Sequence, residues 1–230
     1  MGSKGRYAKY ILPIILKDRR QEQWYVEPFV GAFNIIDKVD GLRLANDINP
    51  YIIALYKAVQ AGWEPPDTLT KEEYQDIRFN KDKYPKHLVG FVGFGCSFGG
   101  KWFGGYAQDK EQRNYCAASK RSVLKQAANL KDVVIENKNY WEITIPPNSI
   151  VYCDPPYENT TKYKTKNPFD HARFWDWVRT TTKEGHTVFV SEYNAPVDFE
   201  CVWSKTVNNT LTQIGSQERV EKLFKFVGGG

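Results

Sequence analysis

The segment Asp154-Pro155-Pro156-Tyr157 places a carboxylate, two prolines and an aromatic ring directly after the apolar run at residues 149–153. That run predicts a buried strand, and the two prolines exclude helix continuation and favour a rigid, extended turn. At the carboxyl edge of an open α/β sheet, such a turn lies where ligands bind. Its acceptor oxygens and its ring suit a flat heterocycle with an exocyclic amine, such as adenine. A simple turn after a strand is the alternative interpretation.

The N-terminal region has the pattern of a βαβ unit that binds a nucleoside. A short strand at residues 24–26 leads into a turn that contains Gly31, a helix is expected to begin at residues 35–36, and a second strand at residues 42–45 ends in Asn46-Asp47. Glycine lets the backbone approach a ligand closely, and an acid at the end of the second strand accepts hydrogen bonds from ribose hydroxyls. Gly31 and Asp47 therefore predict a binding site for a cofactor that contains a nucleoside.

The composition indicates one globular core with room for an inserted subdomain, and it argues against several other classes of protein. The chain has 230 residues, no long uncharged apolar run and a mean hydropathy of −0.56, so we expect no transmembrane helix. The four cysteines show no Cys-x-x-Cys spacing, and the three histidines are far apart. We therefore expect neither a disulfide framework nor a metal site, and a cytoplasmic location. A net charge of +5 permits a polyanionic partner.

Basic residues concentrate in one segment. Residues 78–125 contain ten lysines and arginines against three acidic residues, a net charge of +7, interleaved with aromatic residues. This mixture is typical of nucleic-acid-binding surfaces, although a solvated basic face is the alternative. We predict that residues 61–130 form an inserted, mainly helical target-recognition subdomain, and that residues 1–60 and 131–227 form the main domain. The basic residues expected to contact DNA are Lys101, Arg113 and Arg121, together with Lys162 and Lys164 just after the Asp-Pro-Pro-Tyr turn.

Hydrophobic spacing and end signals predict most of the remaining elements. Helices are expected at residues 50–59, 71–78, 117–130 and 169–180, with Thr70 and Glu73 as a capping box for the second. Strands are expected at residues 133–135, 150–153, 187–190 and 220–226. Seven glycines lie among large aromatic residues at positions 90–105. They indicate either a flexible loop or a core of packed rings, with a close approach of a ligand or DNA to the glycines.

The Asp-Pro-Pro-Tyr segment resembles the (Asp/Asn/Ser)-Pro-Pro-(Tyr/Phe/Trp) motif of amino-methylating DNA methyltransferases, and Asp in its first position is typical of N6-adenine enzymes. Over residues 4–226 the chain is similar to the DNA adenine methylase (Dam) family and its phage relatives. The resemblance implies an α/β fold, the Rossmann-like fold of AdoMet-dependent methyltransferases, with a mixed, mostly parallel seven-stranded sheet. It also implies S-adenosyl-L-methionine (AdoMet) as the cofactor and double-stranded DNA as the partner.

The resemblance and the residue pattern together name the expected site residues. Asp154, Pro155, Pro156 and Tyr157 match the catalytic motif. The residues expected to bind the cofactor are Tyr7, Lys9, Glu27, Pro28, Phe29, Gly31, Asp47, Asn139, Tyr140 and Asp154. Ala32 stands where the family usually has a second glycine, and it would be strained if that position needs a positive φ. A surface lysine is the alternative role for Lys9, and a core position is the alternative role for Tyr140.

The expected reaction is direct, in-line methyl transfer to adenine N6. The Asp154 carboxylate and the Pro155 carbonyl would accept hydrogen bonds from the amine, and the Tyr157 ring would stack on the base. A base inside a duplex must be flipped out to reach such a site. Ser191 is expected either near the target base or as a cap at the end of its strand. The alternatives are methylation of cytosine N4, of an RNA adenine or of a protein glutamine, and an inactive relative that binds DNA or AdoMet.

Overall fold

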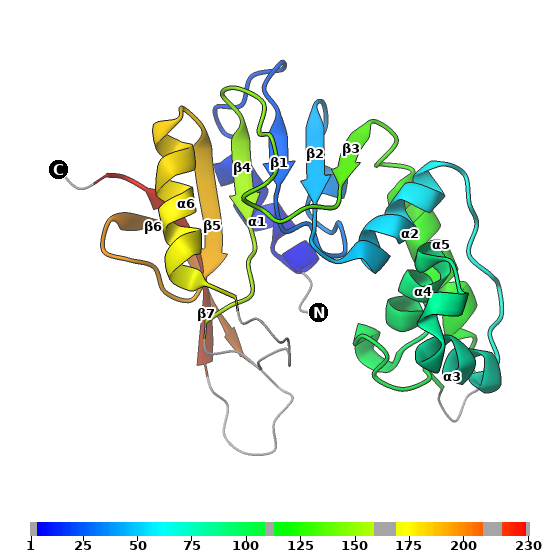
Figure 1. Cartoon of the computed structure of the whole chain (residues 1–230). Helices are drawn as coiled ribbons and strands as arrows, with labels where there is room; N and C mark the ends of the chain where they lie inside the picture. Colours follow the sequence, from blue (N-terminus) through cyan, green and yellow to red (C-terminus); the bar gives the residue numbers. More distant parts are fainter. Residues whose placement is uncertain (1–3, 109–112, 159–168, 209–217, 229–230) are drawn as a thin grey trace.

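The computed structural model describes residues 4–108, 113–158, 169–208 and 218–228. Its centre is a seven-stranded sheet in the order β3-β2-β1-β4-β5-β7-β6 (Figure 1). The strands are β1 (Tyr25–Glu27), β2 (Arg43–Asn46), β3 (Val133–Glu136), β4 (Ile150–Cys153), β5 (Thr187–Glu192), β6 (Phe199–Asn208) and β7 (Glu218–Phe226). The first five strands run parallel to one another, and β7 is antiparallel to both β5 and β6. The prediction of a mixed, mostly parallel sheet is confirmed.

The order of the strands changes direction between β1 and β4. From β1 the chain moves outward through β2 to β3, then returns to β4 on the other side of β1 and moves outward again to β5. All residues of β1, β2 and β4 are buried, as parallel strands covered on both faces require. In open α/β sheets, ligands bind outside the carboxyl ends of the strands at such a switch point. Glu27 and Asp154, at the ends of β1 and β4, therefore mark the expected position of a binding site.

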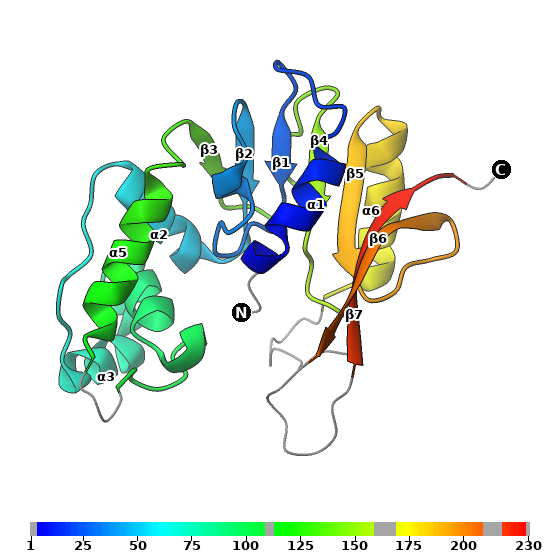
Figure 2. The same cartoon turned by 180° about the vertical axis from the view of Figure 1, so that it is seen from behind.

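Two helices cover opposite faces of the sheet. α1 (Ala8–Ile15) lies across the face seen in Figure 2, and α6 (His171–Lys183) covers the face seen in Figure 1. Side-chain alternation along β4 sends Tyr152 into the apolar core that includes α1, and Cys153 into the core that includes α6. The sheet is thus a middle layer with a separate core on each face. Within the described ranges, no helix is long and apolar enough to cross a membrane.

α2 (Pro50–Gln60) connects the sheet to the segment predicted as an insertion, which is helical as expected. The helices of this segment are α3 (Lys71–Phe79), α4 (Lys86–Gly90) and α5 (Tyr115–Ala127), with short helical turns at Phe91–Gly95 and Phe98–Gly100. Thr70 and Glu73 form the predicted capping box at the start of α3. Most buried side chains of the segment belong to the same apolar core as those of α1 and α2, so the segment packs directly against the rest of the chain.

The glycine-rich segment is a core of packed rings, the second of the two alternatives. Phe103 is buried, and its ring centroid lies 4.7 Å from that of Trp102. A Cβ atom at Gly93 would lie 2.4 Å from the Trp102 ring, and one at Gly90 would lie 2.3 Å from the carbonyl oxygen of Tyr51. The close approaches that require these two glycines are therefore to the protein's own rings and backbone, and not to a ligand or DNA.

Two expectations about individual elements need correction. The helix expected at residues 35–36 is only a short 3-10 turn, Ile36–Lys38, and the chain already turns at Phe33, whose φ is 58°. The ten-residue strand β6 is absent from the sequence prediction. Its pairing with β7 shifts register between Cys201 and Trp203. Such an irregularity interrupts the alternation of polar and apolar residues by which strands are recognised in a sequence.

The substitution Gly90→Ala tests the close packing of α4 on α2. Gly90 has an ordinary helical φ of −61°, so alanine is not strained there by backbone conformation. Overpacking against the backbone of Tyr51 should nevertheless lower the free energy of unfolding by about 1–3 kcal/mol. Lys86→Ala, at an exposed position in the same short helix, is the control. Urea unfolding measures the difference, and equal stabilities of the two variants would contradict this packing.

Candidate active site

One buried side chain, that of Asn46, holds the carboxyl ends of three strands together. Its amide nitrogen donates to the carbonyl oxygens of Pro28, after β1, and Lys138, after β3, each at 3.0 Å. Its amide oxygen accepts a hydrogen bond from the backbone N–H of Lys138, also at 3.0 Å. Asn46 is the last residue of β2 and has no exposed surface. The loops that follow β1, β2 and β3 are therefore fixed relative to one another.

Asp47, the next residue, joins the turn after β1 to the start of α2. Its two carboxylate oxygens accept hydrogen bonds at 2.9 Å from the backbone N–H groups of Gly31 and Asn49. Gly31 has a φ of 51°, a conformation that favours glycine. Burial raises the pKa of Asp47, and the two hydrogen bonds lower it. Ile48, which follows it, is 66% exposed and offers an apolar surface that the sequence prediction does not include.

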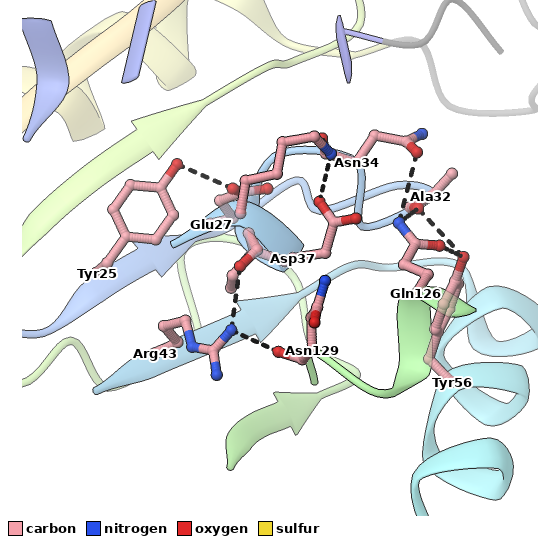
Figure 3. Close-up of polar contacts among 11 residues, drawn as sticks. Tyr25, Glu27, Ala32, Asn34, Asp37, Arg43, Tyr56, Gln126 and Asn129 are labelled. Atoms are coloured by element: carbon pink, nitrogen blue, oxygen red, sulfur yellow. Dashed lines mark hydrogen bonds and ion pairs between the residues drawn. The ribbon is translucent and has the colours of Figure 1, made fainter. Parts of the chain in front are cut away.

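Glu27 ends β1 as a buried carboxyl group near Asp154. The Tyr25 hydroxyl donates a hydrogen bond to Glu27 Oε1 at 2.9 Å (Figure 3). Burial raises the pKa of Glu27 well above its usual range, the hydrogen bond from Tyr25 lowers it, and the charge of Asp154 raises it further. Glu27 is 2% exposed, so it is an internal group of the site and not a charge that faces solvent.

The turn after Gly31 is held in place by α2 and α5. The Ala32 carbonyl oxygen accepts hydrogen bonds from the Tyr56 hydroxyl at 3.2 Å and from the Gln126 amide at 3.0 Å (Figure 3). Ala32, between Gly31 and Phe33, does not have a positive φ, but Phe33 does. The backbone strain considered for Ala32 is therefore found at Phe33. A left-handed conformation costs Phe33 about 1–2 kcal/mol. Its fully buried ring, 4.1 Å from that of Tyr56, offsets this cost.

The Asp-Pro-Pro-Tyr turn leaves β4 and meets two charged residues from distant parts of the chain. The ammonium group of Lys4 lies 2.5 Å from Glu221 Oε2, 3.8 Å from Asp154 Oδ1 and 4.3 Å from the centre of the Tyr157 ring. The Tyr157 hydroxyl donates a hydrogen bond to Glu221 at 3.3 Å. The sequence prediction includes neither Lys4 nor Glu221. Lys4 precedes Tyr7 and Lys9, the N-terminal residues expected at the cofactor, and Glu221 lies on the last strand with no local signal of its own.

The electrostatic surroundings keep Asp154 ionisable near neutral pH. Burial raises the pKa of Asp154 to about 6, the charge of Lys4 lowers it, and the charge of Glu221 raises it. The Asp154 side chain is 25% exposed, so a molecule in solution can contact the carboxylate. At neutral pH the group is therefore mainly an ionised hydrogen-bond acceptor with Lys4 as its neighbouring cation.

Glu192, at the end of β5, holds the far end of the same turn. Its carboxylate oxygens accept hydrogen bonds from the backbone N–H groups of Glu158 at 3.1 Å and Tyr193 at 2.7 Å. Glu192 is 3% exposed, and burial raises its pKa to about 7. The Ser191 hydroxyl pairs with the buried hydroxyl of Tyr152 at 2.8 Å, and a position near the target base stays a prediction for this residue. The sequence prediction does not include Glu192. One of its partners, Glu158, is 34 residues away in the chain, and the other, Tyr193, is the next residue.

Of the aromatic residues expected near the cofactor, Tyr140 is buried and Phe29 is half-buried. Their ring centroids are 5.0 Å apart, with Tyr140 in the apolar core that includes α6 and Phe29 packed against that core. Tyr140 is 5% exposed, and its hydroxyl has no hydrogen-bond partner among the described residues, which supports the core alternative for this residue. Asn139 donates from its backbone N–H at 3.0 Å and from its side chain at 3.2 Å to the carboxylate of Glu142.

The two residues expected from the N-terminal segment have different surroundings: the centre of the Tyr7 ring lies 5.7 Å from the ammonium group of Lys4, the neighbour of Asp154. Tyr7 is buried, with its ring centroid 6.3 Å from that of Trp203. Lys9 is exposed, and its ammonium group lies 5.0 Å from the centre of the Tyr10 ring. This position supports the surface alternative for Lys9, and the lysine that the structure places beside Asp154 is Lys4.

The residues expected to contact DNA are only partly described. Lys101, Arg113 and Arg121 are exposed on the inserted segment. Arg121 lies on α5, and Lys101 follows the turn Phe98–Gly100. Lys162 and Lys164 lie outside the described residues.

Lys4→Met should raise the pKa of Asp154 above its value of about 6. The substitution keeps an unbranched side chain but removes the charge that lowers this pKa, while burial and Glu221 remain. NMR titration of the carboxyl carbons measures the change. Lys9→Met is the matched control, because Lys9 lies over the Tyr10 ring, and it should leave the titration of Asp154 unaltered. A lower pKa of Asp154 in Lys4→Met would contradict this arrangement of charges.

The chain matches the family model of the D12 class N6 adenine-specific DNA methyltransferases over residues 1–88 and 100–221. The gap between the two matched ranges, residues 89–99, contains the turn Phe91–Gly95 and part of the packed aromatic core. The matched ranges contain Lys4, the turn at Gly31, Asp47 and the Asp-Pro-Pro-Tyr segment.

Similar solved structures share only a distant likeness with the chain. A proposed methylase from Haemophilus influenzae is 9% identical, with 98% of this chain and 100% of that chain covered and a TM-score of 0.42. A proposed methyltransferase complexed with SAH is 11% identical, with 99% and 53% covered and a TM-score of 0.39. A proposed class I S-adenosylmethionine-dependent methyltransferase from Listeria monocytogenes is 9% identical, with 96% and 58% covered and a TM-score of 0.40. The family model, in contrast, matches most of the chain. This chain therefore belongs to the D12 class N6 adenine-specific DNA methyltransferase family, whose fold and cofactor are those of AdoMet-dependent methyltransferases.

Proposed function

We propose that the enzyme is a site-specific DNA N6-adenine methyltransferase that acts on an adenine flipped out of duplex DNA. The observation that carries the proposal is the carboxylate of Asp154 beside the ring of Tyr157, at the switch point of the sheet. An ionised acceptor next to a flat ring complements an aromatic base with an exocyclic amine. Membership of a family of N6 adenine-specific enzymes supports the same substrate.

The proposed chemistry depends on the position of two acceptors. Adenine N6 is a weak nucleophile because its lone pair is delocalised into the ring. The Asp154 carboxylate and the Pro155 carbonyl would each accept one hydrogen bond from N6, which stabilises the positive charge that develops on the nitrogen. A pKa of about 6 leaves Asp154 mostly ionised at neutral pH, as an acceptor must be. The excess proton would then leave to solvent, to which the Asp154 side chain is 25% exposed.

Lys4 occupies the place where the base is expected to stack. Its ammonium group lies 4.3 Å from the centre of the Tyr157 ring and is paired with Glu221. A base that stacks on Tyr157 must displace Lys4 from this ring, and Glu221 provides a partner that can keep the ammonium group at the edge of the site. The charge of Lys4 would then remain close enough to Asp154 to favour its ionised form.

We propose that AdoMet is held at the ends of β1 and β2. The carboxylate of Asp47 is already oriented by Gly31 and Asn49, and each of its oxygens has a second lone pair to accept a hydrogen bond from a ribose hydroxyl. The exposed side chain of Ile48 would contact the adenine part. The residues present therefore fit the cofactor, which supplies an electrophilic methyl group on sulfur when bound. The buried Glu27 and the half-buried Phe29 would line the inner side of this site.

We propose residues 61–130 as the target-recognition subdomain, attached to a main domain of residues 1–60 and 131–227. The exposed side chains of Lys101, Arg113 and Arg121 would contact phosphates of double-stranded DNA. Enzymes that modify a base take it out of the stack, and the Tyr157 ring would offset part of the lost stacking. A cytoplasmic location, in a bacterium or a phage-infected cell, accords with such a substrate.

The substrate is tested by incubation with radiolabelled AdoMet and a mixture of DNA and RNA, followed by digestion to nucleosides. We expect the label in N6-methyldeoxyadenosine. Label in N4-methylcytosine or in an RNA nucleoside would replace the proposed substrate by the corresponding alternative.

In the same assay, Asp154→Ala should abolish the labelled product, because N6 loses its charged acceptor. Calorimetry should show nearly unchanged AdoMet binding, since the proposed ribose contacts lie at Asp47. Asp132→Ala, at an exposed position before β3, is the control and should behave as the unaltered enzyme. Retention of most of the activity in a single turnover by Asp154→Ala would remove the proposed mechanism.

Asp47→Ala should weaken AdoMet binding by about 1–3 kcal/mol, the scale of hydrogen bonds to a charged group. Part of this loss would come from the turn at Gly31, which Asp47 holds in place. Asp47→Asn keeps one acceptor oxygen and should lose less. Calorimetry measures both affinities, and far-UV circular dichroism shows whether the variants fold. An unchanged affinity in a folded Asp47→Ala protein would place the cofactor elsewhere.

A further inference from the structure

A basic and aromatic surface on α1 and β6 takes no part in the functions described above. We name it the α1–β6 surface and define it by Arg6, Lys9, Tyr10, Trp203 and Lys205. The Tyr10 ring is 37% exposed and stacks on that of Trp203, with centroids 6.2 Å apart and planes inclined by 23°. The ammonium groups of Lys205 and Lys9 lie 3.7 Å and 5.0 Å from the centre of the Tyr10 ring. Two cations thus flank a partly exposed aromatic ring.

The α1–β6 surface is continuous with the catalytic turn. Lys205 lies directly opposite Glu221 in the antiparallel ladder of β6 and β7. Opposed residues of such a ladder project from the same face. Glu221 binds Lys4, and Lys4 lies 3.8 Å from Asp154. A chain of neighbouring charged groups therefore leads from the catalytic carboxylate to Lys205 and the Tyr10 ring.

A groove with a volume of about 710 Å³ lies along α1, between this helix and the turn Ile36–Lys38, and shares Arg6 and Lys9 with the α1–β6 surface. Its lining combines apolar residues of α1 with the basic residues Arg6, Lys9, Lys17 and Lys38. Lys38 is paired with Asp37 at 2.7 Å, so the charge of the groove comes mainly from the other three. None of the lining residues is acidic. The groove therefore complements a polyanion.

The α1–β6 surface and the inserted segment lie on opposite sides of the catalytic edge. The two edge strands of the sheet are β6 and β3. The insertion begins at the end of α2, and Gln60 at that end donates a hydrogen bond to β3. Figures 1 and 2 show the helices α3, α4 and α5 beyond β3, α1 across the middle of the sheet, and β6 with β7 toward the other edge. Suppose that duplex DNA contacts the insertion on one side of the base bound at Asp154. The base pairs on the other side of that base then lie near the α1–β6 surface.

We infer that the α1–β6 surface is a second DNA contact, which binds the sugar-phosphate backbone flanking the flipped adenine on the side away from the insertion. Lys9, Lys205 and Arg6 neutralise phosphates, and the exposed face of Tyr10 packs on a sugar or an unstacked base. The inference rests on the proposed function, because it requires duplex DNA at the catalytic turn. The alternative is a purely structural role, in which the cations over the Tyr10 ring only stabilise the packing of β6 on α1.

The test compares Lys205→Gln and Tyr10→Ala with Lys131→Gln, an exposed lysine before β3 at the opposite edge of the strands. The probe is a set of short fluorescent duplexes of mixed sequence cut from genomic DNA, and fluorescence anisotropy is measured over a series of salt concentrations. Lys205→Gln should bind these duplexes several-fold more weakly and flatten the slope of log K against log salt by about one unit. Tyr10→Ala should weaken binding and leave the slope unaltered, and Lys131→Gln should match the unaltered protein.

Two further measurements separate the possible outcomes. AdoMet affinity by calorimetry should be the same in all variants, and the methylated base found after digestion should be the same in Lys205→Gln. A lower melting temperature of Lys205→Gln with an unaltered affinity and salt slope would show a folding role and overturn the inference. If the unaltered enzyme methylates no DNA, the proposed function fails. If it methylates DNA and Lys205→Gln binds as tightly as it does, only this inference fails.

Discussion

The buried amide of Asn46 is the constraint on which the rest of the site depends. A polar side chain without exposed surface needs partners inside the protein, and Asn46 finds them in the backbone after β1 and after β3. Parallel strands are joined by long crossovers, so no hairpin turn aligns their ends. The hydrogen bonds of Asn46 supply this alignment, and Asp47 extends it to the turn at Gly31 and to α2.

The aligned strand ends bring together several carboxyl groups, and each is compensated in its own way. Glu27 accepts a hydrogen bond from Tyr25, and Glu192 accepts two from backbone N–H groups. Glu221 and Asp154 share the ammonium group of Lys4. Burial and mutual repulsion raise the pKa values of Glu27, Glu192 and Asp154. Asp154 has a pKa of about 6 and is partly exposed, so it is ionised at neutral pH and accessible, as an acceptor for a substrate amine must be.

In two places, packing between large aromatic rings fixes a part of the chain where the sequence suggested that glycine gives conformational freedom. Phe33 adopts a left-handed conformation and buries its ring against Tyr56 of α2, so the turn after β1 is held against that helix. In the inserted segment, Gly93 lets Trp102 approach the backbone, and the rings form a core continuous with that of α1 and α2. The insertion therefore rests on a packed base, and its basic side chains are left on the outer surface.

The sequence by itself determined the features that depend on neighbouring residues. The strand before Asp154, the turn at Gly31, the acid after β2 and the capping box of α3 are local patterns, and they were sufficient to predict the fold class and the family. Only the tertiary structure decided which residues surround Asp154. Lys4 and Glu221 are 217 residues apart, and no periodic pattern links them. The irregular pairing of β6, the core position of Tyr140 and the positive φ of Phe33 likewise depend on partners distant in the sequence, because burial and pairing between separate elements are properties of the folded chain.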